Sequence, residues 1–366
     1  MALTLFVDSA LTGVPLASVE VQADATILDV RLAAEKVAQS RLRLLHVNGT
    51  SSPLLREKET CTANGIKDQD HILAAIRPSV VHTVLKHYGP DGEIVAAAAE
   101  LKENGSVTTK GGKALGGDSS AVQEQLSQGV SAIYSSGMAF AALKDDGSVV
   151  AWGHRGAGGD TLPVQDQLAD GVQAVTAMKS SFAALKDNGS VIVWGALAKH
   201  QARSQLAADV QTMCSSAYEL AVLKNDHTLV VLGSQEVDEF NGVQAVCATE
   251  EAFALLKEDG SVTCLGSGPA GRLAAVCHVQ DQLSHGVKAV SSTQRAFAAL
   301  KEDGSVVCWG DASEGGDCGA AREQLTDVKE IAGTGGAFAA ITGDRSVVMW
   351  GEESDFEAAR AQMWGR

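Results

Sequence analysis

FAALKDDGSVVAWG, the stretch from Phe140 to Gly153, reads as an apolar strand, a polar turn with Asp-Gly, a Val-rich second strand and a Trp-Gly end. Two short strands joined by a Gly-containing turn predict a β-hairpin. The pattern occurs six more times, in stretches that begin at Ala98, Phe182, Leu220, Phe253, Phe297 and Phe338 and end at Gly111, Gly195, Gly233, Gly266, Gly310 and Gly351. The chain is therefore organised around seven copies of one hairpin.

The spacing of the copies predicts the architecture. Their turn positions, 105, 147, 189, 227, 260, 304 and 345, lie 42, 42, 38, 33, 44 and 41 residues apart. A period near forty with several strands per unit is typical of a propeller or a solenoid.

A second motif lies between the hairpins. Its copies are Gln123–Leu126 with Gly129–Ile133, Gln165–Leu168 with Gly171–Val175, Gln280–Leu283 with Gly286–Val290, and Arg322–Leu325 with Val328–Ile331. Its second part alternates apolar and polar residues and predicts a further strand. Each unit then has three or four short strands and one longer loop.

The two ends of the repeat region suggest how the array closes. The last hairpin is followed only by a partial copy of the second motif in residues 355–365, so the final unit lacks its later strands. We interpret residues 78–95 as a linker and the ring-closing strands that supply them. Closure removes exposed sheet edges. The prediction is a mainly β fold, with a closed seven-bladed β-propeller over residues 96–366.

The sequence of residues 1–77 predicts a separate small α+β domain. Strands are expected at 3–7, 16–21, 41–47, 54–55 and 71–76, with a helix that begins after Thr26 and follows the second strand. This order of elements predicts a β-grasp domain.

The segment resembles ubiquitin. The resemblance rests on Phe6-Val7 with Leu11-Thr12-Gly13, on Leu44–Gly49, and on residues 60–72. Ubiquitin ends in a Gly-Gly tail, whereas Arg77 here is followed by Pro78. The domain is therefore expected to be neither processed nor conjugated.

The positions that match ubiquitin's receptor-binding patch are Leu11, His46 and Ala75. Leu11 alone keeps the apolar bulk, and losing two large apolar contacts removes about 2–3 kcal/mol of binding. We therefore favour an interaction module for a partner other than the ordinary ubiquitin receptors.

The hairpin consensus, Phe-Ala-Ala-Leu-Lys-x-Asp-Gly-Ser-Val-Val-x-Trp-Gly, is similar to the repeats of the regulator of chromosome condensation superfamily. The resemblance covers residues 96–351, and Ser135–Leu143 nearly matches the family signature, which often has His where Phe140 stands. The short units are most similar to the short-blade members, which include a propeller-type β-lactamase inhibitor. The WD-repeat alternative lacks its Trp-Asp ending and Gly-His start here.

Composition narrows the function classes. The net charge is −16, and residues 1–77, with nine acidic and eight basic side chains, contribute −1, which leaves −15 on the repeats. That charge argues against nucleic-acid binding. The sequence shows no run of eighteen apolar residues and no secretory signal, which predicts no membrane association and an intracellular, cytoplasmic or nuclear protein. Seven cysteines, an odd number, argue against a disulfide framework.

We interpret residues that recur at the same position of each repeat as structural residues, which pack in the core or shape turns. Leu232 and Leu265 replace Trp in two copies, so the Trp slot requires apolar bulk. The recurring Gly-Gly-Asp is expected to cap a turn. The cysteines lack metal-ligand spacing, and only Cys277 and Cys318 lie in loops where a reactive thiol is expected. We expect no metal, no cofactor and no catalytic residue.

Residues that break the repeat pattern are the candidate partner-binding residues, because binding residues are common on loops. Solvated variable loops are an equally good interpretation of them. They are His154, Arg155, His200, Arg203, Arg272, His278 and Arg322.

The sequence favours a non-enzymatic protein–protein interaction scaffold or adaptor, linked to the ubiquitin system through residues 1–77. The first alternative is a guanine-nucleotide exchange factor for a small GTPase, which the family resemblance implies. The second is the substrate-binding part of a ubiquitin ligase pathway, without a catalytic domain of its own.

Overall fold

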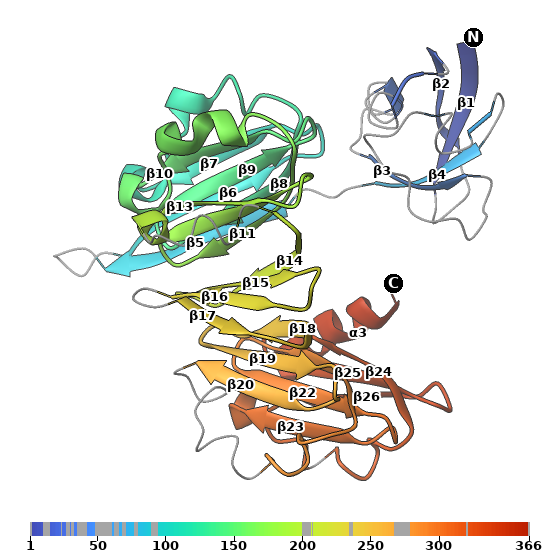
Figure 1. Cartoon of the computed structure of the whole chain (residues 1–366). Coiled ribbons are helices and arrows are strands. Elements are labelled where there is room, and N and C mark those ends of the chain that lie inside the picture. The colour runs from blue at the N-terminus through green and yellow to red at the C-terminus, as the bar shows by residue number, and fades with distance from the viewer. Residues whose placement is uncertain are drawn as a thin grey trace. The chain divides into compact units, whose positions relative to one another are not determined.

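The computed structural model describes most of the repeat region and part of the N-terminal region. The described residues are 2–9, 15–22, 24–26, 30, 33–34, 42–47, 61, 66–67, 71–76, 80–88, 94–199, 206, 208–233, 237–266, 279–319 and 321–364. The chain divides into two compact units, Met1–Gly171 and Val172–Arg366, and each is described by itself (Figure 1).

The N-terminal part of the first unit is a four-stranded sheet. Its strands are β1 (Ala2–Ser9), β2 (Pro15–Gln22), β3 (Leu42–Val47) and β4 (His71–Ile76), in the order β2-β1-β4-β3. β1 pairs antiparallel with β2 and parallel with β4. Val30, Ala33 and Ala34 are helical, as the sequence predicts, while the strand predicted at 54–55 lies outside the described residues.

Apolar side chains at every second position of β1 form the core beneath this sheet. Leu3, Leu5 and Val7, on one face of β1, are buried against Val30 and Ala34 of the helical segment. A strand places every second side chain on the same face, so this periodicity alone directs β1 toward the helix.

The described residues of the repeat region form seven antiparallel sheets. In the first unit they are β5 (Val80–Tyr88), β6 (Ile94–Leu101) and β7 (Val107–Gly111), then β8 (Val130–Ser135), β9 (Ala139–Lys144) and β10 (Val149–Gly153). In the second unit they begin with β11 (Val172–Met178), β12 (Ser181–Lys186) and β13 (Val191–Gly195), then β14 (Val210–Ser215), β15 (Leu220–Lys224), β16 (Leu229–Leu232) and β17 (Val237–Phe240).

Three more sheets complete the second unit. They are β18 (Val243–Ala248), β19 (Ala252–Lys257) and β20 (Val262–Gly266), then β21 (Val287–Ser292), β22 (Ala296–Lys301) and β23 (Val306–Gly310), then β24 (Val328–Gly333), β25 (Ala337–Thr342) and β26 (Val347–Gly351). Helix α3 (Phe356–Trp364) follows. The fold is mainly β, and these three- and four-stranded antiparallel sheets are the units from which propellers are built.

Each predicted hairpin is confirmed as the second and third strands of a sheet. In four sheets a Phe on the second strand lies directly opposite a Trp on the third, with ring centroids 5.1–5.4 Å apart: Phe140 with Trp152, Phe182 with Trp194, Phe297 with Trp309, and Phe338 with Trp350. All eight rings are buried. The Trp slot is therefore a packing position, as predicted.

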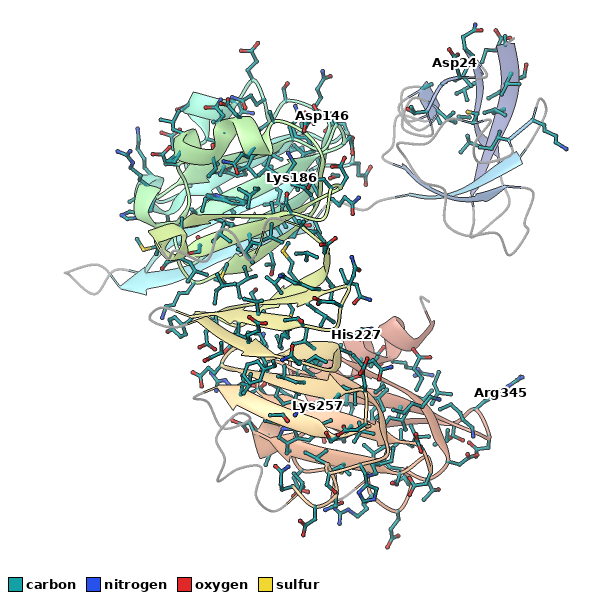
Figure 2. All side chains as sticks on the ribbon, in the orientation of Figure 1. Asp24, Asp146, Lys186, His227, Lys257 and Arg345 are labelled. Atoms are coloured by element: carbon teal, nitrogen blue, oxygen red, sulfur yellow. The ribbon has the colours of Figure 1, made fainter. Side chains whose placement is uncertain are left out.

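The polar turns owe their shape to an acidic or amide side chain. Asp146 Oδ1 accepts hydrogen bonds from the Ser148 backbone N–H at 2.9 Å and from its hydroxyl at 2.6 Å, and Gly147 between them has φ +80°. His227 and Arg345 occupy the same left-handed position at φ +65° and +68° (Figure 2). A side chain is strained there, which explains why Gly is the rule.

Among the described residues, short 3₁₀ helices follow several of the sheets. They are η1 (Lys113–Leu115), η2 (Ser120–Val122), η3 (Arg155–Ala157), η4 (Leu162–Leu168), η5 (Ala196–Lys199), η7 (Ala312–Glu314) and η8 (Glu353–Asp355). The Leu of the second sequence motif anchors these segments: Leu126 and Leu283 are fully buried, and their carbonyls accept the Val107 and Val262 backbone N–H groups.

The Gly-Gly-Asp motif caps turns, as predicted. Gly116, Gly158 and Gly315 end 3₁₀ helices in the left-handed conformation. Two residues on, Asp118, Asp160 and Asp317 each accept a backbone N–H two positions further along. These carboxylates therefore stabilise the turns by accepting hydrogen bonds from the backbone.

One strand assignment differs from the sequence interpretation. Residues 80–95 were expected to complete the final sheet, but β5 forms a sheet with β6 and β7, and the final sheet consists of β24, β25 and β26. The copy at Leu220 has a fourth strand, β17, which pairs with β16 and agrees with the expected three or four strands per unit. Strand pairing depends on long-range register, which a local repeat pattern does not contain.

Within the second unit the first strands of successive sheets contact one another, from β11 through β14, β18 and β21 to β24. At Gly333 of β24 the approach is close, since a Cβ there would lie 2.1 Å from the Ser292 carbonyl oxygen of β21. Polar side chains bridge the same strands, since the Thr176 and Ser215 hydroxyls lie 2.7 Å apart and Cys247 Sγ donates to Ser292 Oγ at 3.2 Å.

Candidate functional site

A row of five loops joins the first and second strands of the sheets in the second unit. Lys179, Ala217, Glu250, Gln294 and Gly335 occupy equivalent positions, each three residues before the apolar residue that starts the hairpin. The backbone N–H of each of the first four donates to the carbonyl of the corresponding residue in the next loop, at 2.7, 2.6, 2.7 and 2.9 Å in chain order. The loops therefore lie side by side. We call residues 179–180, 217–219, 250–251, 294–295 and 335–336 the loop row.

A tight turn holds each loop in place. The backbone N–H of Ser216, Thr249, Thr293 and Thr334 each donates to a carbonyl three residues on, at 2.8–3.0 Å. The Thr293 hydroxyl also accepts the Ala296 N–H at 3.0 Å and donates to the Glu314 carbonyl at 3.1 Å. Because backbone and short hydroxyl groups fix these turns, the residues at their tips are free to differ from sheet to sheet.

An aromatic ring and a cation mark the first two loops of the row. Lys179 Nζ donates to the Tyr218 hydroxyl at 2.8 Å and lies 5.1 Å from the centre of its ring. This hydrogen bond raises the pKa of Lys179, which keeps the ammonium charged. Tyr218 is 56% exposed, although it is a large aromatic residue.

An ion-pair cluster occupies the next two loops. Arg295 Nε lies 3.6 Å from Glu250 Oε2 and 3.9 Å from Glu314 Oε1. Burial raises the pKa of Glu314, and the Arg295 charge opposes that shift. At these distances and exposures the pairs are weak, so Arg295 remains available to an incoming anion.

The last loop of the row has acidic neighbours. The Asp355 carboxylate accepts the Gly336 N–H at 2.5 Å, and a Cβ on Gly336 would lie 2.8 Å from Glu352 Oε2. Burial, with a smaller contribution from Asp238, raises the pKa of Glu219. The loop row thus places an exposed aromatic ring, two cations and several carboxylates on five adjacent loops, which is the chemistry of a recognition surface.

Sequence reasoning placed the variable positions in the longer loops and missed the loop row. A signal was present: residues three and two positions before each Phe differ in every copy of the second unit, while the residues that follow repeat.

The structure describes three of the seven candidate partner-binding residues that the sequence analysis named. His154 and Arg155 are exposed at the start of η3, and Arg155 Nε lies 2.7 Å from Asp160 Oδ2, so it braces the Gly-Gly-Asp turn as Lys113 does at Asp118. Arg322 is exposed in the second unit. The others, His200, Arg203, Arg272 and His278, lie outside the described residues.

The ubiquitin-like patch is described only in part. Leu11 lies outside the described residues. By their backbones, His46 lies on β3 and Ala75 on β4, and these strands pair, with Arg43 opposite Ala75. The ubiquitin-like patch stays a prediction.

Most cysteines are packing residues in the part of the chain that the structure describes. Cys61, Cys214, Cys247, Cys264, Cys308 and Cys318 are free thiols. Burial raises the pKa of Cys214 and Cys264 to about 12. The described residues include no group of three His, Cys, Asp or Glu side chains placed to hold a metal ion. They also include no helix that is long and apolar enough to span a membrane.

No protein-family model matches the chain, and no curated protein sequence matches it. Among solved structures, the CRINKLY WD40 ectodomain of the Arabidopsis thaliana receptor kinase ACR4 is 14% identical, with a TM-score of 0.39 over 75% of this chain and 96% of that one. Prp20p from Saccharomyces cerevisiae, in a structure reported with its binding properties to Gsp1p and histones, is 14% identical, with a TM-score of 0.38 over 79% and 96%. Yeast RCC1 (Prp20) bound to Kap60 is 16% identical, with a TM-score of 0.39 over 74% and 82%. Matches at this level assign no function.

Proposed function

We propose that the chain is a protein-interaction scaffold that binds a protein partner through the loop row. The observation that carries the proposal is the contrast within each repeat: the buried hairpin positions are nearly constant, whereas the loop tips vary, and in the first four loops of the row they are half-buried or exposed. Tyr and Arg are enriched among residues that dominate binding energies, and Tyr218 and Arg295 both lie in the loop row.

Two further elements belong to this proposal. Residues 78–366 close into a propeller ring, which the succession of antiparallel sheets supports. Residues 1–77 form a ubiquitin-like module that binds a second partner, which the strand order β2-β1-β4-β3 supports. A chain with two binding modules acts as an adaptor between their partners.

Crosslinking at the loop row tests the proposal. A photo-crosslinking amino acid replaces Tyr218 in the full-length chain, and the crosslinked proteins are identified and then prepared pure for affinity measurements. We expect Lys179→Ala with Arg295→Ala to weaken the binding of a purified partner about 30-fold or more, because losing two such anchors at about 1 kcal/mol or more each removes at least about 2 kcal/mol.

The matched control lies at the other end of the second strands. Asn225→Ala with Glu302→Ala changes two exposed residues of the hairpin turns and leaves the loop row intact. Equal losses in both variants, or no purified partner that binds, overturn the proposal. Accelerated nucleotide release from a purified small GTPase would replace the scaffold by an exchange factor.

A further inference from the structure

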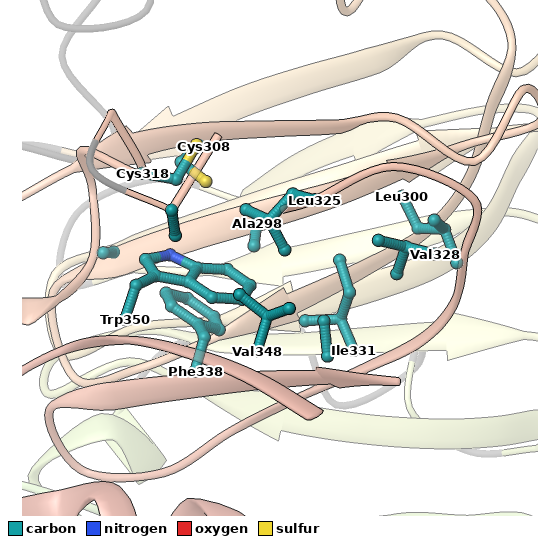
Figure 3. Packing of buried hydrophobic residues seen from close by; sticks show 13 residues of the cluster. Ala298, Leu300, Cys308, Cys318, Leu325, Val328, Ile331, Phe338, Val348 and Trp350 are labelled. Carbon is teal, nitrogen blue, oxygen red and sulfur yellow. The ribbon is translucent and has the colours of Figure 1, made fainter. Parts of the chain in front are cut away.

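Two cysteines meet in the core of the sixth and seventh sheets of the repeat region. Cys308 lies on β23, and Cys318 lies in the turn that follows η7. They are 6% and 2% exposed and belong to the cluster that contains Phe338 and Trp350. Figure 3 shows their sulfur atoms side by side.

The repeat register shows that this contact is built into the fold. Cys308 stands two residues before Gly310, and Cys318 follows a Gly-Gly-Asp. The equivalent residues in the first repeat are Thr109 and Ser119, whose hydroxyl oxygens lie 2.9 Å apart. The fold therefore brings the ends of these two side chains together in both repeats. In the sixth repeat both ends are sulfur.

The surroundings favour reaction at Cys318. The neighbouring Cys308 thiol lowers the pKa of Cys318, and the Arg322 charge adds to the effect, while burial opposes it. The Cys318 thiol and burial raise the pKa of Cys308. Asp317 and Gly319, on either side of Cys318, are exposed, so the thiol lies directly beneath the surface of the turn.

We propose that Cys308 and Cys318 are a redox-active dithiol that closes reversibly to an intramolecular disulfide when hydrogen peroxide oxidises it. The Cys318 thiolate attacks one peroxide oxygen, the O–O bond breaks, and the departing hydroxide takes a proton to become water. The Cys308 sulfur then attacks the resulting sulfenic acid, and its hydroxyl leaves with the Cys308 proton as a second water. Two thiols lose two electrons in total, and the peroxide gains them.

Peptide mapping of the full-length chain tests the proposal. The reduced protein is treated with hydrogen peroxide, quenched, denatured, alkylated and digested. We expect the peptides of Cys308 and Cys318 to be joined and two hydrogens lighter, and the alkylated thiols to fall from seven to five, the seven cysteines minus these two. Dithiothreitol restores all seven. The reaction should slow as the pH falls, because Cys318 becomes protonated.

The hydroxyl pair of the first repeat suggests the control variant. Cys308→Thr with Cys318→Ser recreates the hydroxyl pair of the first repeat, so it should fold and keep its five remaining thiols in peroxide. Cys308→Thr alone stops at a sulfenic acid on Cys318, which dimedone labels. Seven alkylated thiols in the peroxide-treated wild type, or a disulfide that joins Cys277 to either cysteine, overturn the proposal.

Discussion

The hairpins and the loop row repeat in different ways within the second unit. Each hairpin repeats its side chains, such as Phe297 opposite Trp309, because both rings are fully buried. The loop row repeats only its backbone, because the hydrogen bonds from Lys179 through Gly335 use N–H and carbonyl groups. Side chains are constrained where packing holds the fold together, and they are free where the backbone does.

The largest effect is expected from a substitution in the buried part of a hairpin. Phe297→Ala leaves a cavity against Trp309 and should lower the free energy of unfolding by about 3–5 kcal/mol, measured by urea denaturation. Gln294→Ala, three residues earlier in the loop row, should change it by less than about 0.5 kcal/mol. Similar costs at both positions would contradict the comparison.

A smaller effect is expected where two first strands approach closely. Gly333→Ala places a Cβ 2.1 Å from the Ser292 carbonyl oxygen and should cost about 1–3 kcal/mol in unfolding free energy through strand displacement. The equivalent Ala248 of β18 already carries a Cβ, so Ala248→Ser is the control and should cost less. Melting temperatures of both variants test this, and a neutral Gly333→Ala would show that β24 can move.

Arg345→Gly should increase stability. Arg345 has φ +68° at a turn position where Gly147 and Gly304 stand in other copies (Figure 2). Relief of the left-handed strain exceeds the added flexibility of the unfolded chain, for a net gain of about 0.5–1 kcal/mol. Gly304→Arg is the reverse control and should lose stability, so a lower melting temperature for Arg345→Gly would show that its side chain has a role of its own.

The smallest effect is expected from removing the charge of a turn residue while its hydrogen bonds are kept. Hydrogen bonds from Ser305 lower the pKa of Asp303 in the folded chain, so its stabilising contribution is present above about pH 4 and is lost as the pH falls through the folded pKa. Asp303→Asn keeps the turn, as Asn188 does at the equivalent position. The stability difference between wild type and variant should therefore shrink in thermal melts as the pH falls below about 4. A constant difference would mean that charge contributes nothing.

Much of the fold is local and was therefore predictable. The hairpins, the turn-capping role of Asp118 and the burial of Leu126 all follow from residues close in sequence. The partner of β5 and the extra strand β17 were not predictable, because both depend on which distant edge a strand meets. The sequence did not predict the loop row for the same reason, since its five loops come together only through hydrogen bonds between sheets.

The sequence by itself determined the repeat, its hairpins and which face of each strand is apolar, because a period of two and a tight turn need only neighbouring residues. Only the tertiary structure decided that five loops form one hydrogen-bonded row and that Cys308 reaches Cys318. Both contacts join residues that the chain separates by whole strands or loops, and packing alone sets such distances.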